Sequence, residues 1–228
     1  MALTSVIHGT HECQGALRYL PMAASLTPTI ADAKRQATVD RVLAATRQLM
    51  MARGLDVTMD EIAEAAGVGR RTLFRHFESR ERLIADAFDD GVQRYGERLP
   101  TFQGDWRTWL RGLCDEAHRM QAGYGAGYWE LTSRTDLPKE LAAVERRRRV
   151  RRRQAMTHIA RQLWHEAGGR GEPPATVVAG VGAHLSARFT AAVTNDVGQT
   201  WTVAADLAYA AISALLETAD LPLTLADQ

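Results

Sequence analysis

The stretch TMDEIAEAAGVGRRTLFRHFESRERLI, which spans Thr58–Ile84, decides the fold of the N-terminal part of this chain. Thr58 and Glu61 form a T-x-x-E capping box, in which each side chain bonds the backbone N–H of the other residue, so a helix begins here. Gly67 can adopt the left-handed conformation that ends this helix. A second short helix begins at Arg70, so the stretch predicts a helix-turn-helix.

The second helix of this motif has a strongly basic outer face. Between Gly67 and Arg82, five arginines stand against two carboxylates, which gives a local charge of +3. The whole chain carries a formal net charge of only +1. A local basic patch suits the phosphate backbone of DNA, and arginine can bind guanine bidentately in the major groove. The motif therefore predicts a DNA-binding unit.

Helical periodicity continues on both sides of the motif, and no strand-like alternation occurs. Before the motif, apolar residues recur at three- and four-residue steps from Ala31 until Gly54 ends the helix. After it, Ser79 begins an amphipathic helix that runs to Pro100. Further helices are predicted over residues 105–121, 124–134, 138–167, 175–194 and 200–219. The fold class is therefore predicted to be all-α.

The composition, with 46% hydrophobic and 24% charged residues in 228, is that of an ordinary soluble globular protein. Cys13 and Cys114 lie far apart in sequence, which predicts no disulfide framework and fits a reducing compartment. The longest nearly apolar run, Leu207–Leu216, is far shorter than the ~18 residues that suggest a membrane span. We expect a cytoplasmic protein without membrane contact.

The segment from Thr58 to Leu83 resembles the TetR (tetracycline repressor) family of bacterial transcription regulators. Members typically show a threonine, an I-A-x-x-A-G-V core, T-L-Y-x-H-F, and Ser-Lys near the next helix start. The matching residues here are Ile62, Ala63, Ala66, Gly67, Val68, Thr72, Leu73, Phe74, His76, Phe77, Ser79 and Arg80. Two of them depart from the pattern, because Phe74 stands for the usual tyrosine and Arg80 for the usual lysine.

The resemblance implies which side chains of the motif contact double-stranded operator DNA. The side chains assigned to base reading are Arg70, Arg71 and Thr72, with Arg75 as a weaker candidate. The side chains assigned to phosphate contacts are Thr58, Phe74, His76 and Arg80. A homodimer is expected, because a twofold pair of recognition helices reads two half-sites about 34–36 Å apart on a palindromic operator.

The resemblance also implies the domain organisation. Residues 31–80 are expected to form the three-helix DNA-binding domain, and residues 81–228 a larger helical domain for dimerisation and for binding a small-molecule effector. The apolar stripes of the last two helices fit a four-helix bundle with their twofold mates and an intramolecular core equally well. Residues 1–30 show no periodicity and are expected to be a disordered extension, with Met22 as an alternative start.

Aromatic side chains concentrate in the middle helices, where spacing alone favours ordinary core over a ligand pocket. The family context favours a pocket, as in other helical bundles. The residues that we expect to line it are Trp106, Trp109, His118, Tyr128, Trp129, Arg148, Arg152 and Phe189. Cys114 and His118 lie one turn apart without a third ligand in register, so no metal is expected. No cofactor and no catalytic residue is predicted.

The run RRRRVRRR over Arg146–Arg153 reads most simply as a solvated helix face. Helical counting nevertheless turns Arg148, and either Arg151 or Arg152, towards the inside. A buried guanidinium needs an acceptor. We expect acidic residues such as Asp115 and Glu116 to supply it across the bundle, and the alternative is an anionic ligand.

The favoured interpretation is a repressor that a small-molecule effector releases from its operator. An activator or a ligand-independent regulator is the main alternative. An enzyme fused to a DNA-binding module is another, although the chain shows no nucleophile elbow, phosphate loop or zinc signature. A purely structural helical adaptor would leave the exposed arginines of the motif unexplained.

Overall fold

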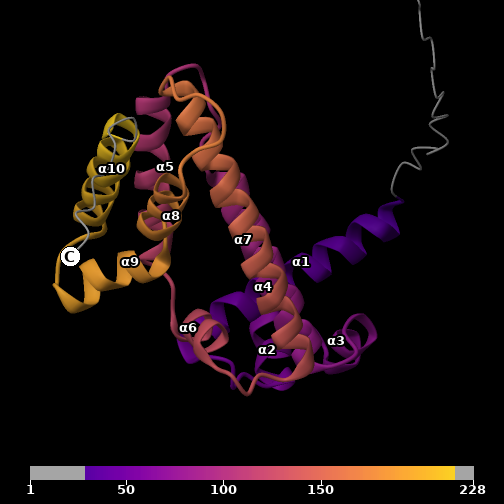
Figure 1. Ribbon diagram of the computed structural model, residues 1–228. Coiled ribbons are helices and arrows are strands. Elements are labelled where there is room, and N and C mark those ends of the chain that lie inside the picture. Colours follow the sequence, from indigo (N-terminus) through magenta and orange to yellow (C-terminus); the bar gives the residue numbers. More distant parts are fainter. Residues whose placement is uncertain (1–28, 219–228) are drawn as a thin grey trace, which may run out of the picture.

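The computed structural model describes residues 29–218, and the regular structure in this range is entirely helical (Figure 1). In chain order the elements are α1 (Ile30–Arg53), α2 (Met59–Ala66), α3 (Arg70–His76), α4 (Arg80–Arg98), α5 (Trp106–Gln121), α6 (Ala126–Ser133), α7 (Lys139–Glu166), α8 (Ala175–His184), α9 (Ala187–Ala191), the short π-helix η1 (Ala192–Asp196) and α10 (Trp201–Thr218). The all-α prediction is confirmed. Residues 1–28 of the expected N-terminal extension, with Cys13 and Met22, lie outside the described residues, whereas Thr29 and Ile30 are the N-cap and first residue of α1.

Local sequence signals set the helix-turn-helix, which is formed by α2 and α3. The Glu61 N–H donates to Thr58 Oγ1 at 3.3 Å, and the Thr58 N–H donates to Glu61 Oε2 at 2.8 Å, so the predicted capping box is present. Gly67 has φ 61° and ψ 39°, the left-handed conformation that lets the chain reverse. Ile62 of α2 and Leu73 of α3 are completely buried and fix the two helices against α1 and α4.

Side chains of α7 take part in two hydrophobic cores. Figure 1 shows this long helix running from the group α5, α8 and α10 to the group α1–α4. The first core joins α1–α4 and includes Leu141 and Val144 from the N-terminal part of α7. The second joins α5, α8 and α10 and includes Ile159 and Leu163 from the C-terminal part of α7. At a rise of ~1.5 Å per residue, α7 links these cores over about 40 Å.

Helix α6 is pressed against the C-terminal part of α1. A Cβ atom on Gly125 would lie 1.9 Å from the Met51 carbonyl oxygen, and one on Gly127 would lie 2.7 Å from the Met50 carbonyl oxygen. Only glycine allows this approach. The Leu55 N–H also donates to Glu130 Oε2 at 2.8 Å, which ties α6 to the loop that precedes α2.

The prediction of one helix over residues 175–194 is wrong. The chain bends by 52° between Ala175–His184 and Ala187–Asp196. Ser186 adopts an extended conformation at the bend, and its Oγ accepts a hydrogen bond from the Phe189 N–H at 3.1 Å. Ser186 therefore begins a new helix as an N-cap, although the apolar periodicity runs on through it.

Over residues 29–218, no single helix is both long and apolar enough to cross a membrane. The bent pair that joins Ala175–His184 to Ala187–Asp196 meets that test by length and composition only.

Candidate nucleic-acid interface and ligand pocket

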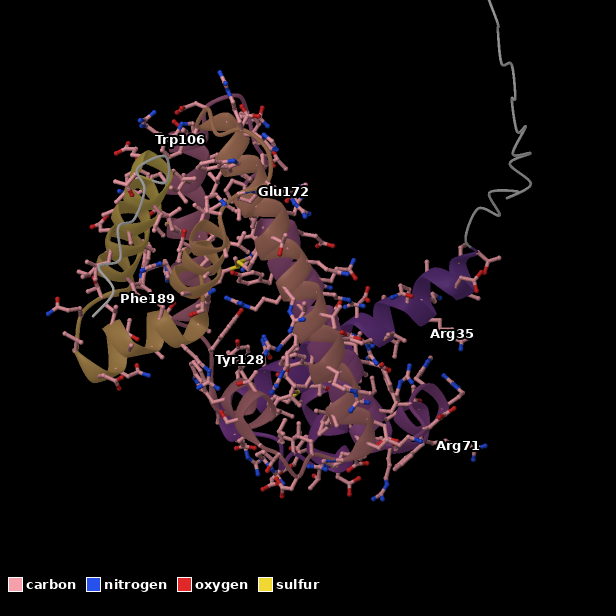
Figure 2. All side chains as sticks on the ribbon, in the orientation of Figure 1. Arg35, Arg71, Trp106, Tyr128, Glu172 and Phe189 are labelled. Carbon is pink, nitrogen blue, oxygen red and sulfur yellow. The ribbon has the colours of Figure 1, made fainter. Side chains whose placement is uncertain are left out.

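Helix α3 presents arginines whose guanidinium groups are not used inside the protein. Arg71 and Arg75 are exposed and make no hydrogen bond or ion pair with any residue of the range 29–218. Figure 2 shows Arg71 at the outer edge of α3, directed away from the cores. Thr72 is half-buried beside them. The surface of α3 can therefore offer two unoccupied guanidinium groups to an acidic or hydrogen-bonding partner.

Arg70, unlike Arg71 and Arg75, makes an ion pair within the protein. Its Nη1 donates to Asp60 Oδ2 at 2.8 Å, with both side chains more than 60% exposed. Its guanidinium carbon also lies 5.5 Å from the ring centroid of Phe74, which is 45% exposed. An exposed ion pair of this kind contributes at most about 1 kcal/mol, so Arg70 can exchange Asp60 for a nucleic-acid acceptor at little cost.

Thr58 serves first as a structural group. Its hydroxyl accepts the Glu61 N–H and donates to Glu61 Oε2 at 3.0 Å. The bond from the Thr58 N–H, together with those from Arg53 and the Thr58 hydroxyl, lowers the pKa of Glu61 to about 2. The capping carboxylate therefore stays ionised at neutral pH. A phosphate contact by Thr58 stays a prediction.

His76 lies half-buried at the end of α3, beside a basic residue that sequence reasoning missed. Burial lowers the pKa of His76, and the positive charges of Arg75 and Arg35 lower it further. Arg35 projects from α1 on the same side of the molecule as Arg71 (Figure 2). Arg35 thus extends the basic surface of α3 onto α1.

Arg80 is occupied within the protein. Its Nε donates to the Val57 carbonyl at 2.6 Å, its Nη2 donates to the Leu55 carbonyl, and its Nη1 pairs with Glu81 Oε1 at 2.8 Å. The guanidinium thereby fixes the loop between α1 and α2 to the first turn of α4. The phosphate contact expected of Arg80 stays a prediction, and it must compete with these carbonyls.

A cavity of about 510 Å³ lies between α6, α7 and the bend from α8 into α9. Its lining residues are Tyr128, Trp129 and Thr132 of α6; Glu145, Arg148, Arg149, Arg152, Arg153, Met156 and Thr157 of α7; Val178 and Gly182 of α8; and Ser186, Ala187 and Arg188 at the bend. This volume falls in the range of pockets that bind small organic molecules.

Of the eight residues expected to bind a ligand, the structure places four in the cavity lining and four outside it. Tyr128, Trp129, Arg148 and Arg152 all line the cavity. His118 and Phe189 are not in the lining; their rings pack together, with centroids 5.8 Å apart.

The two tryptophans of α5 lie elsewhere. Trp106 and Trp109 are buried at the beginning of α5, and Figure 2 shows Trp106 far from Tyr128. Trp109 Nε1 donates to the Pro100 carbonyl at 2.8 Å, and its ring packs against Phe102. Both tryptophans belong to the second hydrophobic core, so the structure does not bring them to the cavity.

Asp115 and Glu116 were the expected acidic partners of the inward arginines, and this prediction is wrong. Arg148 bonds Glu145 on its own helix, with Nε–Oε2 and Nη2–Oε1 distances of 2.6 and 2.8 Å. Asp115 and Glu116 instead pair with arginines of α5. Burial would raise the pKa of Glu145, but the bonds from Arg148 and Arg149 outweigh burial and lower it. The ion pair between Arg148 and Glu145 is therefore fully charged at neutral pH.

The other arginines of the run face different directions. Arg152 is half-buried and its Nη2 donates to the Gly182 carbonyl at 2.7 Å. Arg151 is exposed and pairs with Asp89 of α4 at 3.1 Å. Of the two alternatives for the second inward arginine, the structure therefore selects Arg152.

Within residues 29–218, no three or more His, Cys, Asp or Glu side chains are grouped so that they could hold a metal ion. Cys114 is a buried free thiol whose pKa burial raises to about 12.

A family model matches the N-terminal part of this chain, and solved structures match most of its length. Residues 42–87, which cover the C-terminal half of α1, all of α2 and α3, and the first part of α4, match the family model for bacterial regulatory proteins of the tetR family. No curated protein sequence gives a match.

Solved structures match over most of the chain, though at low sequence identity. A candidate transcriptional regulator from Pseudomonas aeruginosa PAO1 aligns with a TM-score of 0.62 and 16% identity, over 81% of this chain and 92% of that one. NalD, the secondary repressor of the MexAB-OprM multidrug efflux pump in Pseudomonas aeruginosa, aligns with a TM-score of 0.52 and 18% identity, over 79% and 96%. At these identities the likeness establishes the fold.

Proposed function

We propose that this chain is a transcription regulator of the tetR type, whose family model matches residues 42–87. It is a repressor that binds a palindromic operator as a homodimer and leaves it when a small-molecule effector occupies the cavity. The observation that carries the proposal is the position of α6, which lines the cavity and also packs against the DNA-binding domain.

The DNA-binding step rests on α3. Arg71 and Arg75 are exposed and make no bond to another described residue, and Arg70 is held only by an exposed ion pair. Guanidinium groups on an exposed helix that follows a tight turn can reach base edges in the major groove. Arg35 on α1 adds a further positive charge on the same side of the molecule.

The release step rests on α6. Tyr128, Trp129 and Thr132 form one wall of the cavity, while Gly125 and Gly127 of the same segment contact the backbone of α1. Because Gly125 and Gly127 bring the backbone of this segment into direct contact with that of α1, we expect a shift of α6 to move α1 as well. A ligand that prefers a shifted α6 would therefore favour a different spacing of the two α3 helices in a dimer.

The dimerisation step rests on α8 and α10, which pack side by side (Figure 1). One face of α10, with Ala205, Ala208 and Ile212, is buried in the second core. The remaining face exposes small or apolar side chains at helical spacing, among them Leu207, which is 50% exposed. On α8, the residues Thr176, Ala179 and Ala183 are exposed at the same spacing. Two such faces can bury each other across a twofold axis.

A fluorescence anisotropy titration with DNA from the region flanking the gene of this protein tests the proposal. We expect binding to a palindromic site in preference to a scrambled duplex of equal length and salt. Addition of extracted cytosolic small molecules should then release the protein from that site. Binding of both duplexes with equal affinity would contradict operator recognition.

The same DNA placed upstream of a reporter separates repression from activation. A repressor lowers reporter expression when the protein is present, whereas an activator raises it. Repression is favoured by analogy with NalD, which is a repressor. A regulator that is independent of ligands would bind the site unchanged in every extract fraction. If the protein acts on chromosomal DNA in this way, it works in the cytoplasm.

A further inference from the structure

The cavity carries an excess of positive charge. Five arginines line it and one carboxylate, Glu145, stands against them. The arginines are Arg148, Arg149, Arg152, Arg153 and Arg188. Arg148 and Arg152 are half-buried, where like charges repel one another most strongly because water is partly excluded, whereas Arg149, Arg153 and Arg188 are exposed. The lining therefore favours an anion.

The internal bonds of the cavity satisfy only part of this charge. Arg148 and Arg149 share the single carboxylate of Glu145, at 2.6 and 2.7 Å. Arg152 donates one N–H to the neutral carbonyl of Gly182. Arg153 and Arg188 make no hydrogen bond or ion pair with other residues of the range 29–218. One carboxylate thus faces five guanidinium groups.

The rest of the lining is apolar or carries hydroxyl groups. Tyr128 and Trp129 form an aromatic corner with ring centroids 5.1 Å apart. The Arg148 guanidinium carbon lies 5.7 Å from the centroid of Tyr128, which keeps the charge at the edge of this corner. Met156 and Val178 add aliphatic surface. Such a wall can bury the body of an aromatic or aliphatic molecule.

We propose that the effector is a small organic anion, a carboxylate or a phosphate monoester with an aromatic or apolar body, and that Arg152 and Arg188 bind its anionic group. This inference rests on the proposed function, because it names the chemistry of the ligand that the cavity takes. The guanidinium group matches both carboxylate and phosphate through paired N–H donors. A lone inorganic ion would leave most of the 510 Å³ unfilled.

The position of Arg152 makes it the main determinant. Its guanidinium is half-buried on the inward face of α7 and keeps donors beyond the one used by Gly182. Arg188 approaches from the opposite side, at the start of α9. An anion between them would join α7 to the bend after α8. Arg148 is a poorer test, because its removal would leave Glu145 with one partner fewer.

The test measures ligand binding by the purified full-length protein without DNA. The probes are 2-naphthoate, 2-naphthyl phosphate and the neutral isostere 2-naphthamide, each titrated by calorimetry. We expect at least one anion to bind about tenfold or more tightly than the amide, as a charge-assisted hydrogen bond allows. The Arg152→Gln and Arg188→Gln variants should each lose most of this preference. Arg146→Gln, on the same helix but outside the cavity, should keep it.

The two naphthyl anions distinguish a carboxylate from a phosphate ligand by which of them binds more tightly. Equal affinity for the anions and the amide, binding of none of the three, or an unchanged preference in both glutamine variants would overturn the proposal. Operator binding by the same variants is measured separately. If operator binding is intact while the charge preference is absent, only the ligand class is wrong. If the preference is present but operator binding is absent, the repressor proposal fails and the anion site stands.

Discussion

The side-chain amide of Gln121 on α5 donates a hydrogen bond to the phenol oxygen of Tyr95 on α4, with an N–O distance of 3.1 Å. The same amide nitrogen donates to the Leu185 carbonyl at 3.1 Å, and Gln121 Oε1 accepts a hydrogen bond from Thr190 at 2.7 Å. One buried side chain therefore links α4, which follows the helix-turn-helix, to the bend that closes the cavity. Burial raises the pKa of Tyr95 to about 12, so the phenol stays protonated.

We expect this link to show as an interaction free energy in a double-mutant cycle. Tyr95→Phe should lower the free energy of unfolding by about 1 kcal/mol, and Gln121→Leu by about 1–3 kcal/mol, because it leaves buried acceptors unpaired. The effects should be non-additive by about 1 kcal/mol in urea titrations. Tyr209→Phe, whose ring lies 4.0 Å from the guanidinium carbon of Arg111 near the other end of α5, serves as the control partner. Strict additivity of Tyr95→Phe and Gln121→Leu would contradict the link.

Arg71→Ala should abolish selective operator binding. A base-edge contact contributes about 1–3 kcal/mol of discrimination, and a twofold dimer loses the contact twice. Fluorescence anisotropy with operator and scrambled duplexes gives the ratio of affinities. Arg98→Ala serves as the control. Arg98 lies at the end of α4 that is farther from the α2–α3 motif, so this variant removes the same charge but should leave the ratio of operator to scrambled affinity unchanged. A mutant at Arg71 that still prefers the operator would remove this arginine from base reading.

Arg80→Ala should destabilise the fold as well as weaken DNA binding. The carbonyls of Leu55 and Val57 belong to buried residues and would lose their donor, at about 1–3 kcal/mol of unfolding free energy. If Arg80 also contacts a phosphate, the slope of log affinity against log salt should fall by about one unit for each subunit. Arg82→Ala, which loses only an exposed pair with Asp86, is the matched control. Wild-type stability in Arg80→Ala would contradict the structural role.

Replacing Leu207 and Ala211 together with glutamate should give helical monomers. Both side chains lie on the face of α10 that is not buried in the second core, so two charges there oppose an apolar interface without disturbing the fold. Light scattering gives the mass and circular dichroism the helix content. Val150→Glu, a similarly exposed apolar position on α7, should remain dimeric. A double mutant that stays dimeric would place the interface elsewhere.

Acid should destabilise the protein through His118. Burial lowers the pKa of His118 to about 4, with a further lowering by His184. Between that value and the unfolded pKa of about 6.5, the unfolded chain binds a proton that the native protein does not, so stability falls as the pH falls. The loss from pH 8 to pH 5 is about 2 kcal/mol.

The measurement is urea unfolding of the wild type and His118→Gln at both pH values. The variant should lose less stability between them, since glutamine does not titrate. An equal loss in both proteins would assign the acid sensitivity to other groups. His118 is completely buried and its Nε2 has no hydrogen-bond partner among the described residues, which is why protonation there is so unfavourable.

The α2–α3 motif could be predicted from the sequence because its signals are local. The Thr58 capping box, the glycine turn and the alternation of buried and exposed residues act within a few residues of one another. The bend at Ser186 was also encoded locally, by an N-cap, but the continuous apolar periodicity concealed it. The cap decides the backbone there, whereas the periodicity only decides which side is buried.

The cavity could be predicted only in part. Helical counting placed Arg148 and either Arg151 or Arg152 on the inward face of α7; of these, Arg148 and Arg152 line the cavity. The sequence could not predict that Tyr128 lines the cavity while Trp106 lies in a core. Both side chains are partly or wholly buried, and an aromatic residue has the same sequence pattern in either place.

The sequence by itself determined the all-helical fold and the basic α3, since capping, turn chemistry and amphipathic spacing depend on neighbours along the chain. The tertiary structure alone decided that Arg152 rather than Arg151 lines the cavity, that Arg80 binds the carbonyls of the α1–α2 loop, and that α6 touches both the cavity and α1. These relationships depend on which helix faces bury each other, and packing of residues distant in sequence sets that choice.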